Sequence, residues 1–394
     1  MRFRTNLSLS NIEAPPIAEA MTWVRKTQGN RRLLNLSQAV PSYPPAPELT
    51  AALAEALREP ATSLYTDILG LPELRSALAN HFSADYQAQV STEDVAIVAG
   101  CNQAFCTAML ALAEPGDNVV LPAPYYFNHA MWLGMLGIEV RAVDCFASGS
   151  GYPSVADVER QIDSRTRAIV ICSPNNPTGA IYPAELIGAL NTLAASKGIA
   201  LVADETYKDF RDDASPPHHA FNQSGWRESF IQLYSFSKTY ALTGYRVGSI
   251  TASPEFLAEI EKVMDCVAIC APHVGQLAAL YGLNHLQSWA AAKRELMASR
   301  KAALRKAFGT KGLEYKLMSS GAYFAYVKHP FPDRTSKEVA RMLASEHDVL
   351  CLPGSMFGPG QEMYLRLAYA NVEVDAMPIL TERLFESHTS GSQS

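Results

Sequence analysis

A lysine that could act as a nucleophile follows directly after an apolar segment. Residues 230–234 read FIQLY, and Ser235, Phe236, Ser237 and Lys238 come next. Because burying an ammonium group is costly, the pKa of a lysine at the end of a buried strand should fall, or its amine should be capped covalently. The flanking serines offer hydroxyl donors. The alternative is an ordinary lysine in a surface loop, since short motifs also match by chance.

Two segments have residue types that suit a phosphate group. Arg246 stands between Gly244 and Gly248, and its guanidinium fork can meet two phosphate oxygens while the glycines permit close backbone approach. Gly100 lies between an apolar run and a predicted helix at 102–113, where backbone N–H groups form a cradle for an anion. Each signal by itself is weak, because α/β proteins commonly contain such turns.

Two further polar segments come at the ends of apolar runs. Asp204 ends the run ALVAD and should point into a cleft, where it could keep a pyridine nitrogen protonated; such a pair at about 4 Å is worth about 4 kcal/mol. Tyr207 follows and could donate to a phenolate oxygen. Alternatively, Asp204 caps the following turn. In residues 173–179, SPNNPTG, two prolines and a glycine predict a rigid turn that presents an Asn amide.

The elements that position these residues alternate along the chain. Short apolar runs predict buried strands, and they are separated by predicted helices such as 102–113 and 183–197. This pattern indicates a mainly parallel sheet covered on both faces, that is, a three-layer α/β/α domain whose ligands bind at the carboxyl ends of the strands. The apolar runs are 95–98, 119–121, 168–172, 200–203 and 230–234.

The predicted order of helices and strands changes after residue 285. Long helical segments at 286–308 and 335–346 surround a strand-rich stretch at 321–328, which predicts a smaller α/β domain that the N-terminal segment joins. We therefore expect a large domain at 48–285 and a small domain made of 1–47 and 286–394.

The lysine, aspartate, asparagine and glycine segments together resemble one known family. In order and spacing they are similar to the class I/II aminotransferases (aspartate aminotransferase-like), which are pyridoxal 5′-phosphate (PLP) enzymes of fold type I. The resemblance runs from about residue 30 to 380. It implies that Lys238 holds the cofactor as an aldimine and, once released by substrate, moves the α-proton. It also implies that Asp204 pairs with the pyridine nitrogen, and that Tyr207 and Asn176 contact the phenolate oxygen.

The resemblance assigns further residues to the cofactor. Those that would hold the phosphate are Ser235, Ser237, Arg246 and the segment Gly100, Cys101 and Asn102. At the position of Cys101 the family often has a hydroxyl residue, so this sequence departs from the pattern there. Tyr126 matches the aromatic residue that stacks on the pyridine ring, with simple core packing as the alternative.

Three more matches concern the substrate and a second subunit. Arg366, in Tyr364-Leu365-Arg366, matches the arginine that binds the substrate α-carboxylate. Ala39 stands where the family usually has a glycine near that carboxylate. Tyr65 matches a tyrosine that reaches the phosphate of the neighbouring subunit, which implies a homodimer.

The implied function is transfer of the amino group of an L-amino acid to a 2-oxo acid. The segment 263–273, which in the family contributes to the neighbour's pocket, contains no arginine. Neutral or aromatic amino acids are therefore favoured over acidic ones. A PLP-dependent C–S β-lyase or another lyase would look almost alike in sequence, because fold does not fix chemistry, and this alternative stays open.

Composition excludes several other classes. The net charge of −6 and the dispersed basic residues give no face for nucleic acid. We find no secretory signal and no apolar run long enough to span a bilayer. The seven cysteines are scattered without a C-x-x-C pair, which suits reduced thiols in the cytoplasm, and neither they nor the nine histidines have metal-ligand spacing. We expect a cytoplasmic enzyme without a metal.

Overall fold

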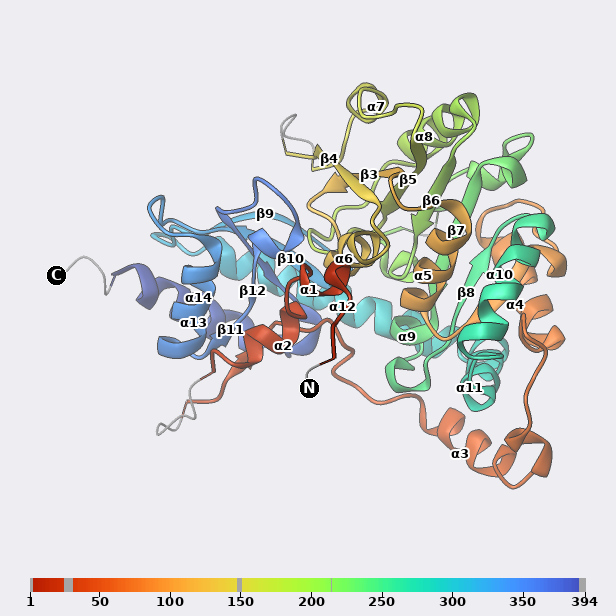
Figure 1. The fold of residues 1–394 in the computed structure, drawn as a ribbon. Helices are drawn as coiled ribbons and strands as arrows, with labels where there is room; N and C mark the ends of the chain where they lie inside the picture. Colours follow the sequence, from red (N-terminus) through yellow and green to blue (C-terminus); the bar gives the residue numbers. More distant parts are fainter. Residues whose placement is uncertain (1–2, 25–30, 147–150, 214, 390–394) are drawn as a thin grey trace.

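A seven-stranded sheet forms the larger part of this computed structural model, which describes residues 3–24, 31–146, 151–213 and 215–389. The strand order is β2-β8-β7-β6-β5-β3-β4 (Figure 1). β8 is antiparallel to both of its neighbours, and the other neighbouring pairs are parallel. The strands are β2 Val95–Val98, β3 Asn118–Ala123, β4 Glu139–Asp144, β5 Thr166–Cys172, β6 Ala200–Asp204, β7 Phe230–Ser235 and β8 Gly248–Thr251. The predicted mainly parallel sheet is confirmed.

Helices cover both faces of this sheet. Alternate residues point to opposite sides, so Leu201 and Ala203 of β6 pack into one apolar cluster, and Ala200 and Val202 pack into another. Because both faces are buried, the strands read as continuous apolar runs. The first cluster includes residues of α3 Pro47–Ala56, α4 Pro72–Asp85, α8 Ala184–Lys197 and α11 His273–His285; the second includes residues of α5 Cys101–Leu112, α6 Phe127–Met135 and α10 Pro254–Val267. The three-layer α/β/α arrangement is therefore confirmed.

Two strands of the sheet were not predicted. β4 is an edge strand with the sequence EVRAVD, and both of its terminal residues are exposed, so it lacks the apolar run that marked the others. β8 reads GSIT and is fully buried although three of its four residues are not large apolar ones. Both strands were missed because their residues are too polar to form an apolar run. One of them lies at the edge of the sheet and the other in its interior.

A second, antiparallel sheet lies beside the first in the order β12-β13-β10-β9. Its strands are β9 Lys316–Gly321, β10 Phe324–Lys328, β12 Leu352–Pro353 and β13 Tyr364–Leu367, and it is accompanied by α13 Ser336–Glu346 and α14 Ala376–Thr389. Strand β1, Leu34–Asn35, pairs in parallel with β11, Val349–Leu350. The N-terminal segment thus shares an apolar core with the C-terminal region. The domain boundaries at 47/48 and 285/286 stay a prediction.

The long helix α12, Gln287–Phe308, connects the two regions (Figure 1). It contacts α11 on the side of the large sheet and β9 and α14 on the other. Two short helices, α1 Leu7–Ser10 and α2 Pro16–Met21, contact α6 and β12 respectively. Among the helices of the described residues, none is long and apolar enough to cross a membrane.

The parallel strands bring distant polar residues to one edge of the large sheet. Cys172 at the end of β5 is in register with Asp204 at the end of β6. Asp204 is in turn in register with Leu233 of β7, close to the point where the chain enters α9, Phe236–Thr239. Because the carboxyl ends of these strands coincide, the side chains that follow them meet in one place.

Candidate active site

A cavity of about 290 Å³ lies at this edge of the sheet, between the large sheet and residues of the C-terminal region. Twelve of the fourteen predicted site residues line it: Ala39, Cys101, Asn102, Tyr126, Asn176, Asp204, Tyr207, Ser235, Ser237, Lys238, Arg246 and Arg366. Gly100 adjoins the cavity as the residue before α5, and Tyr65 lies outside it.

Lys238 lies on the one-turn helix α9 at the end of β7. The Ser235 Oγ caps this helix by accepting the backbone N–H of Ser237 at 3.2 Å. The Lys238 Nζ donates to the carbonyl oxygen of Ala39 at 2.7 Å. Burial, followed by the positive charges of Arg246 and Arg366, lowers the pKa of Lys238 to about 8. The amine is therefore partly unprotonated near neutral pH, as a nucleophile or base requires.

Asp204 has a ring of donors around its buried carboxylate. His129 Nε2 lies 3.2 Å from Oδ2, while Oδ1 accepts the Thr206 backbone N–H at 3.0 Å, the Thr206 hydroxyl at 2.7 Å and the Cys101 thiol at 3.3 Å. Burial opposes ionisation, but the hydrogen bonds from His129 and Thr206 outweigh it and lower the pKa of Asp204 below its ordinary value. The carboxylate thus stays ionised beside the cavity.

An anion cradle lies where α5 begins. Gly100 has φ +86°, and a Cβ there would lie 2.3 Å from Nη2 of Arg246, so only glycine lets the guanidinium lie against this turn. Arg246 Nη2 donates to the carbonyl of Ala99 at 3.2 Å, and Nη1 donates to that of Thr243 at 3.0 Å. The guanidinium and the N-terminus of α5 together place positive charge at one end of the cavity.

Arg366 lies at the opposite wall, on β13 of the small sheet. It is 1% exposed, and its Nη1 donates to Oδ1 of Asn176 at 3.1 Å while its Nη2 donates to the carbonyl of Ser37. Burial lowers the pKa of Arg366 to about 10. Its Nε has no hydrogen-bond partner among the described residues. Each Nη carries a second N–H beyond the one used in these bonds, so a buried guanidinium at the cavity wall is suited to receive a carboxylate.

The turn that carries Asn176 is cross-linked by hydrogen bonds. The side-chain oxygen of Asn175 accepts both the backbone N–H of Thr178 at 3.1 Å and its hydroxyl at 2.9 Å. Gly179, in the same turn, packs directly on Gly321 of β9, where an added Cβ would lie 2.4 Å from the Gly321 backbone nitrogen. Close backbone contact therefore joins this turn to the small sheet.

The three predicted tyrosines differ in their surroundings. The Tyr126 ring lies edge-on to His129 with centroids 5.2 Å apart, beside the cavity. Tyr207 packs against Tyr323 and Phe324, and burial raises its pKa well above the ordinary value, so its hydroxyl stays a donor. Tyr65 is 75% exposed and does not reach the cavity of its own chain.

Sequence reasoning missed two side chains that hold the Asp204 carboxylate. His129 lies three residues after Tyr126, and Thr206 lies between Asp204 and Tyr207, but neither was assigned a role. No fixed spacing links His129 to Asp204, because the two come from different strand–helix connections. Three apolar residues of the lining, Ile17, Val40 and Phe127, were missed for the same reason.

The cavity residues fit the PLP that the sequence resemblance implies. An aldehyde needs an amine with a lowered pKa, a pyridine nitrogen needs a carboxylate, and a phosphate needs the cradle formed by Gly100 and Arg246. The cavity volume lies near the lower end of the range for ligand sites, roughly 300–1,000 Å³. The aldehyde, the ring nitrogen and the phosphate would thus each meet a group of suitable chemistry here.

Comparisons with known proteins give one consistent result. The family model "Aminotransferase class I and II" matches residues 31–384. The aromatic aminotransferase ISS1 of Arabidopsis thaliana is 29% identical over 89% of this chain and 88% of its own length, and an aspartate aminotransferase of Thermotoga maritima is 28% identical over 90% of each. The solved aspartate aminotransferase of Thermus thermophilus with maleate superposes with a TM-score of 0.87 at 25% identity, over 98% of this chain and 100% of that one.

The lowered pKa of Lys238 predicts how its reactivity changes with pH. In protein freed of small ligands, trace labelling of Lys238 by acetic anhydride should rise with pH through a midpoint near 8, because only the unprotonated amine reacts. Exposed lysines, with an ordinary pKa of about 10.4, should still be gaining reactivity above pH 9 and serve as the internal control. Peptide mass spectrometry measures both. A Lys238 midpoint at the ordinary value would show that the amine is not desolvated.

Proposed function

The chain belongs to the class I and II aminotransferase family, and we propose that it uses PLP, held on Lys238, to transfer the amino group of a neutral or aromatic L-amino acid to a 2-oxo acid. The observation that carries this proposal is the shared cavity of Lys238, Asp204 and Arg366. An amine of lowered pKa, a carboxylate kept ionised and a buried guanidinium lie around one space. These are the three groups that removal of an α-proton from an amino acid requires.

When bound, PLP supplies an aldehyde and a protonated pyridine ring that withdraws electrons from the substrate Cα. Asp204 would hold the proton of the ring nitrogen, and His129 and Thr206 keep its carboxylate ionised and oriented. Arg246, Ser235, Ser237 and the turn Gly100–Asn102 would bind the phosphate. Tyr207 and Asn176 would donate to the phenolate oxygen, and Tyr126 would pack on the ring.

Lys238 has two tasks in this proposal. Its Nζ would hold PLP through the aldehyde group, and the free amine would accept the proton from the substrate Cα. A pKa of about 8 suits both tasks, because the amine is available as a base near neutral pH and its conjugate acid can return the proton. The Ala39 carbonyl, 2.7 Å from Nζ, can steady the amine between these steps.

Arg366 and Asn176 would bind the substrate α-carboxylate. A bidentate guanidinium fixes the plane of the carboxylate and thereby helps to orient the Cα–H bond. The Ala39 methyl, where the family usually has glycine, narrows this part of the cavity.

The remaining lining supports a preference for neutral or aromatic side chains. Ile17, Val40 and Phe127 contribute an apolar wall. Among the described residues of the cavity, Lys238, Arg246 and Arg366 are the basic ones, and each already has a proposed role. A second carboxylate on the substrate would therefore be buried without a cation, which is costly. The names of the relatives do not separate the two substrate classes, because they include both an aromatic and an aspartate aminotransferase. The proposed preference therefore rests on the residues that line the cavity.

Borohydride reduction tests the proposed attachment. With PLP bound, reduction should fix the cofactor to the peptide that contains Lys238, and Lys238→Ala should abolish the label and lower kcat by about 10⁴-fold or more, because the general base is lost. Lys262→Ala, an exposed lysine of α10, is the matched control and should change neither. Labelling of another lysine, or full activity of Lys238→Ala, would contradict the proposal.

Steady-state kinetics test the substrate proposal. We expect kcat/KM for phenylalanine and for neutral amino acids to exceed that for aspartate by about tenfold or more, since an unpaired carboxylate is costly to bury. Arg366→Ala should raise KM for each amino acid by about 100-fold, because hydrogen bonds to a charged group are lost. Arg305→Ala, an exposed arginine of α12, is the control. Equal rates with aspartate, or ammonia release without a 2-oxo acid acceptor, would contradict this assignment.

We further propose a homodimer in which Tyr65 reaches the cavity of the partner. Leu64 and Tyr65 are 67% and 75% exposed, and Val267, the last residue of α10, is 60% exposed. His273, at the start of α11, lies 3.3 Å from the Leu64 carbonyl, so these exposed apolar side chains come from adjoining segments. A second copy would cover them.

Sedimentation and cofactor binding test the dimer. The protein should sediment at twice the mass of one chain. Tyr65→Phe should keep that mass but raise the Kd for PLP by about tenfold, because the phosphate loses one donor to a charged group. A monomer, or an unchanged Kd in the variant, would exclude the shared site.

We also propose that the protein works in the cytoplasm. All seven cysteines are unpaired thiols in the structure, and reduced thiols suit that compartment.

A further inference from the structure

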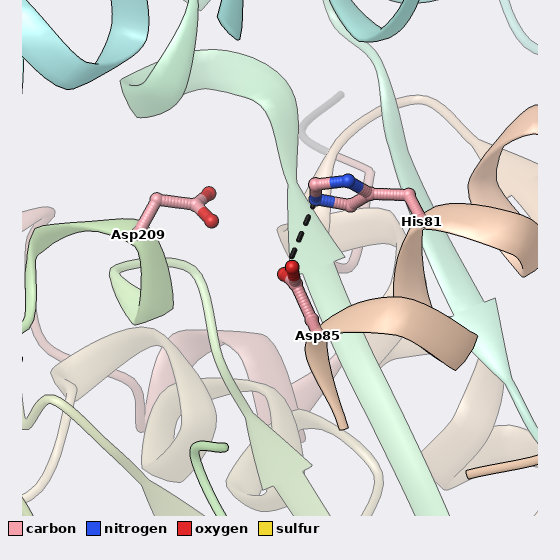
Figure 2. Close-up of side chains that lie close together, drawn as sticks. All are labelled: His81, Asp85 and Asp209. Carbon is pink, nitrogen blue, oxygen red and sulfur yellow. Dashed lines mark ion pairs between the residues drawn. The ribbon is translucent and has the colours of Figure 1, made fainter. Parts of the chain in front are cut away.

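A cluster of charged side chains lies outside the cavity, where α4 meets the turn after β6. Figure 2 shows His81 and Asp85 of α4 turned toward Asp209, with the ion pair between His81 and Asp85 at 3.3 Å. Such a cluster could hold a metal ion. Here the Nζ of Lys208 lies 2.5 Å from Oδ2 of Asp85 and 2.8 Å from Oδ1 of Asp209. The chain's own ammonium thus supplies the positive charge between the two carboxylates.

The Lys208 ammonium is buried, so its charge needs a partner. The Lys208 side chain is 2% exposed and lies against the rings of Phe82, Tyr86 and Tyr234. Burial alone would lower the pKa of Lys208, but Asp209 and Asp85 outweigh it and keep the pKa above the ordinary value. Lys208 therefore stays charged, and Asp209 stays ionised beside it.

Lys208 binds Oδ1 of Asp209, which leaves Oδ2 to accept hydrogen bonds from other elements. Asp209 Oδ2 accepts the hydroxyl of Thr239 at 2.5 Å and the hydroxyl of Tyr234 at 2.6 Å. Tyr234 belongs to β7, and Thr239 is the last residue of α9, directly after Lys238. Asp209 is thus hydrogen-bonded to the residue next to Lys238 on the chain.

Helix α9 depends on such contacts because it has only four residues. A single helical turn is unstable by itself, since few hydrogen bonds offset the loss of backbone freedom. Ser235 caps its N-terminal end, and the hydroxyl of Thr239 ties its C-terminal end to Asp209. The direction in which Lys238 leaves the backbone therefore depends on both ends being held.

Asp209 also belongs to the segment that carries Tyr207. The two residues belong to one tight turn, in which the backbone N–H of Phe210 donates to the carbonyl of Tyr207 at 3.0 Å. The backbone carbonyl of Asp209 accepts Nε of Arg294, on α12, at 2.8 Å. One residue outside the cavity thus connects two residues that line it, Tyr207 and Lys238.

We infer that Asp209, held by Lys208, is a positioning residue that sets the Lys238 amine relative to Tyr207 through its hydrogen bond with Thr239. This inference rests on the proposed function, because it assigns the contact to the attachment of the PLP aldehyde to Lys238. A displaced amine would still leave the phosphate cradle and Asp204 in place. Attachment to Lys238 and binding in the cavity should therefore be separable.

Thr239→Val tests this separation, since it removes the hydroxyl and keeps the shape of the side chain. In protein freed of cofactor, the rate at which PLP is trapped on Lys238 by cyanoborohydride should fall about tenfold, because the amine is misplaced. The Kd for pyridoxine 5′-phosphate, which has an alcohol in place of the aldehyde and cannot attach to Lys238, should stay within about twofold, because its contacts to the cradle are unchanged. Thr239→Ser restores the hydroxyl and should recover the trapping rate.

Matched variants separate this role from general stability. Thr381→Val removes a buried threonine hydroxyl on α14, far from the cavity, and should leave the trapping rate unchanged. Asp209→Asn should slow trapping at least as much as Thr239→Val. If the Asp209→Asn protein does not fold, the trapping rate of Thr239→Val still tests the inference. Wild-type rates in Thr239→Val, or an equal loss of pyridoxine 5′-phosphate binding, would overturn the inference. Failure of the wild type to trap PLP at Lys238 would instead refute the proposed function.

Discussion

The ε-amine of Lys238 lies in a buried space with two arginines and an aspartate, and the fold has to make that arrangement stable. Burial and the positive charges of Arg246 and Arg366 favour the neutral amine, while Asp204 opposes them. The balance places the pKa near 8, where the amine can serve as nucleophile and as base. Any displacement of the arginines or of Asp204 would shift that balance.

Asp204 and Arg366, two charged residues that line the cavity, are each held by hydrogen-bond partners. His129 and Thr206 support Asp204, and Asn176 and the Ser37 carbonyl support Arg366. These contacts keep the side chains in fixed orientations before a ligand arrives, which lowers the cost of binding. The Lys208–Asp209 pair extends the same principle to the helix that carries Lys238.

The cavity needs both parts of the chain. Lys238, Asp204 and the Gly100 turn belong to the large sheet, whereas Arg366 comes from β13 and Ala39 from the N-terminal segment. The Gly179–Gly321 contact and helix α12 join the two parts. A substrate held by Arg366 against a cofactor held by Lys238 would therefore lie at their junction.

The pattern of apolar runs was enough to identify the polar residues that follow the buried strands. Lys238, Asp204 and Asn176 lie within four residues of the ends of apolar runs, and the ends of parallel strands meet at one edge, so local pattern sufficed to bring them together. Strands β4 and β8 could not be predicted, because one is a charged edge and the other has small polar residues. Only the tertiary structure decided that His129 meets Asp204 and that Lys208 neutralises Asp85 and Asp209. The His129–Asp204 and Lys208–Asp85 contacts join residues far apart along the chain, and no spacing rule encodes them; packing of α6 and α4 against the sheet brings them within reach.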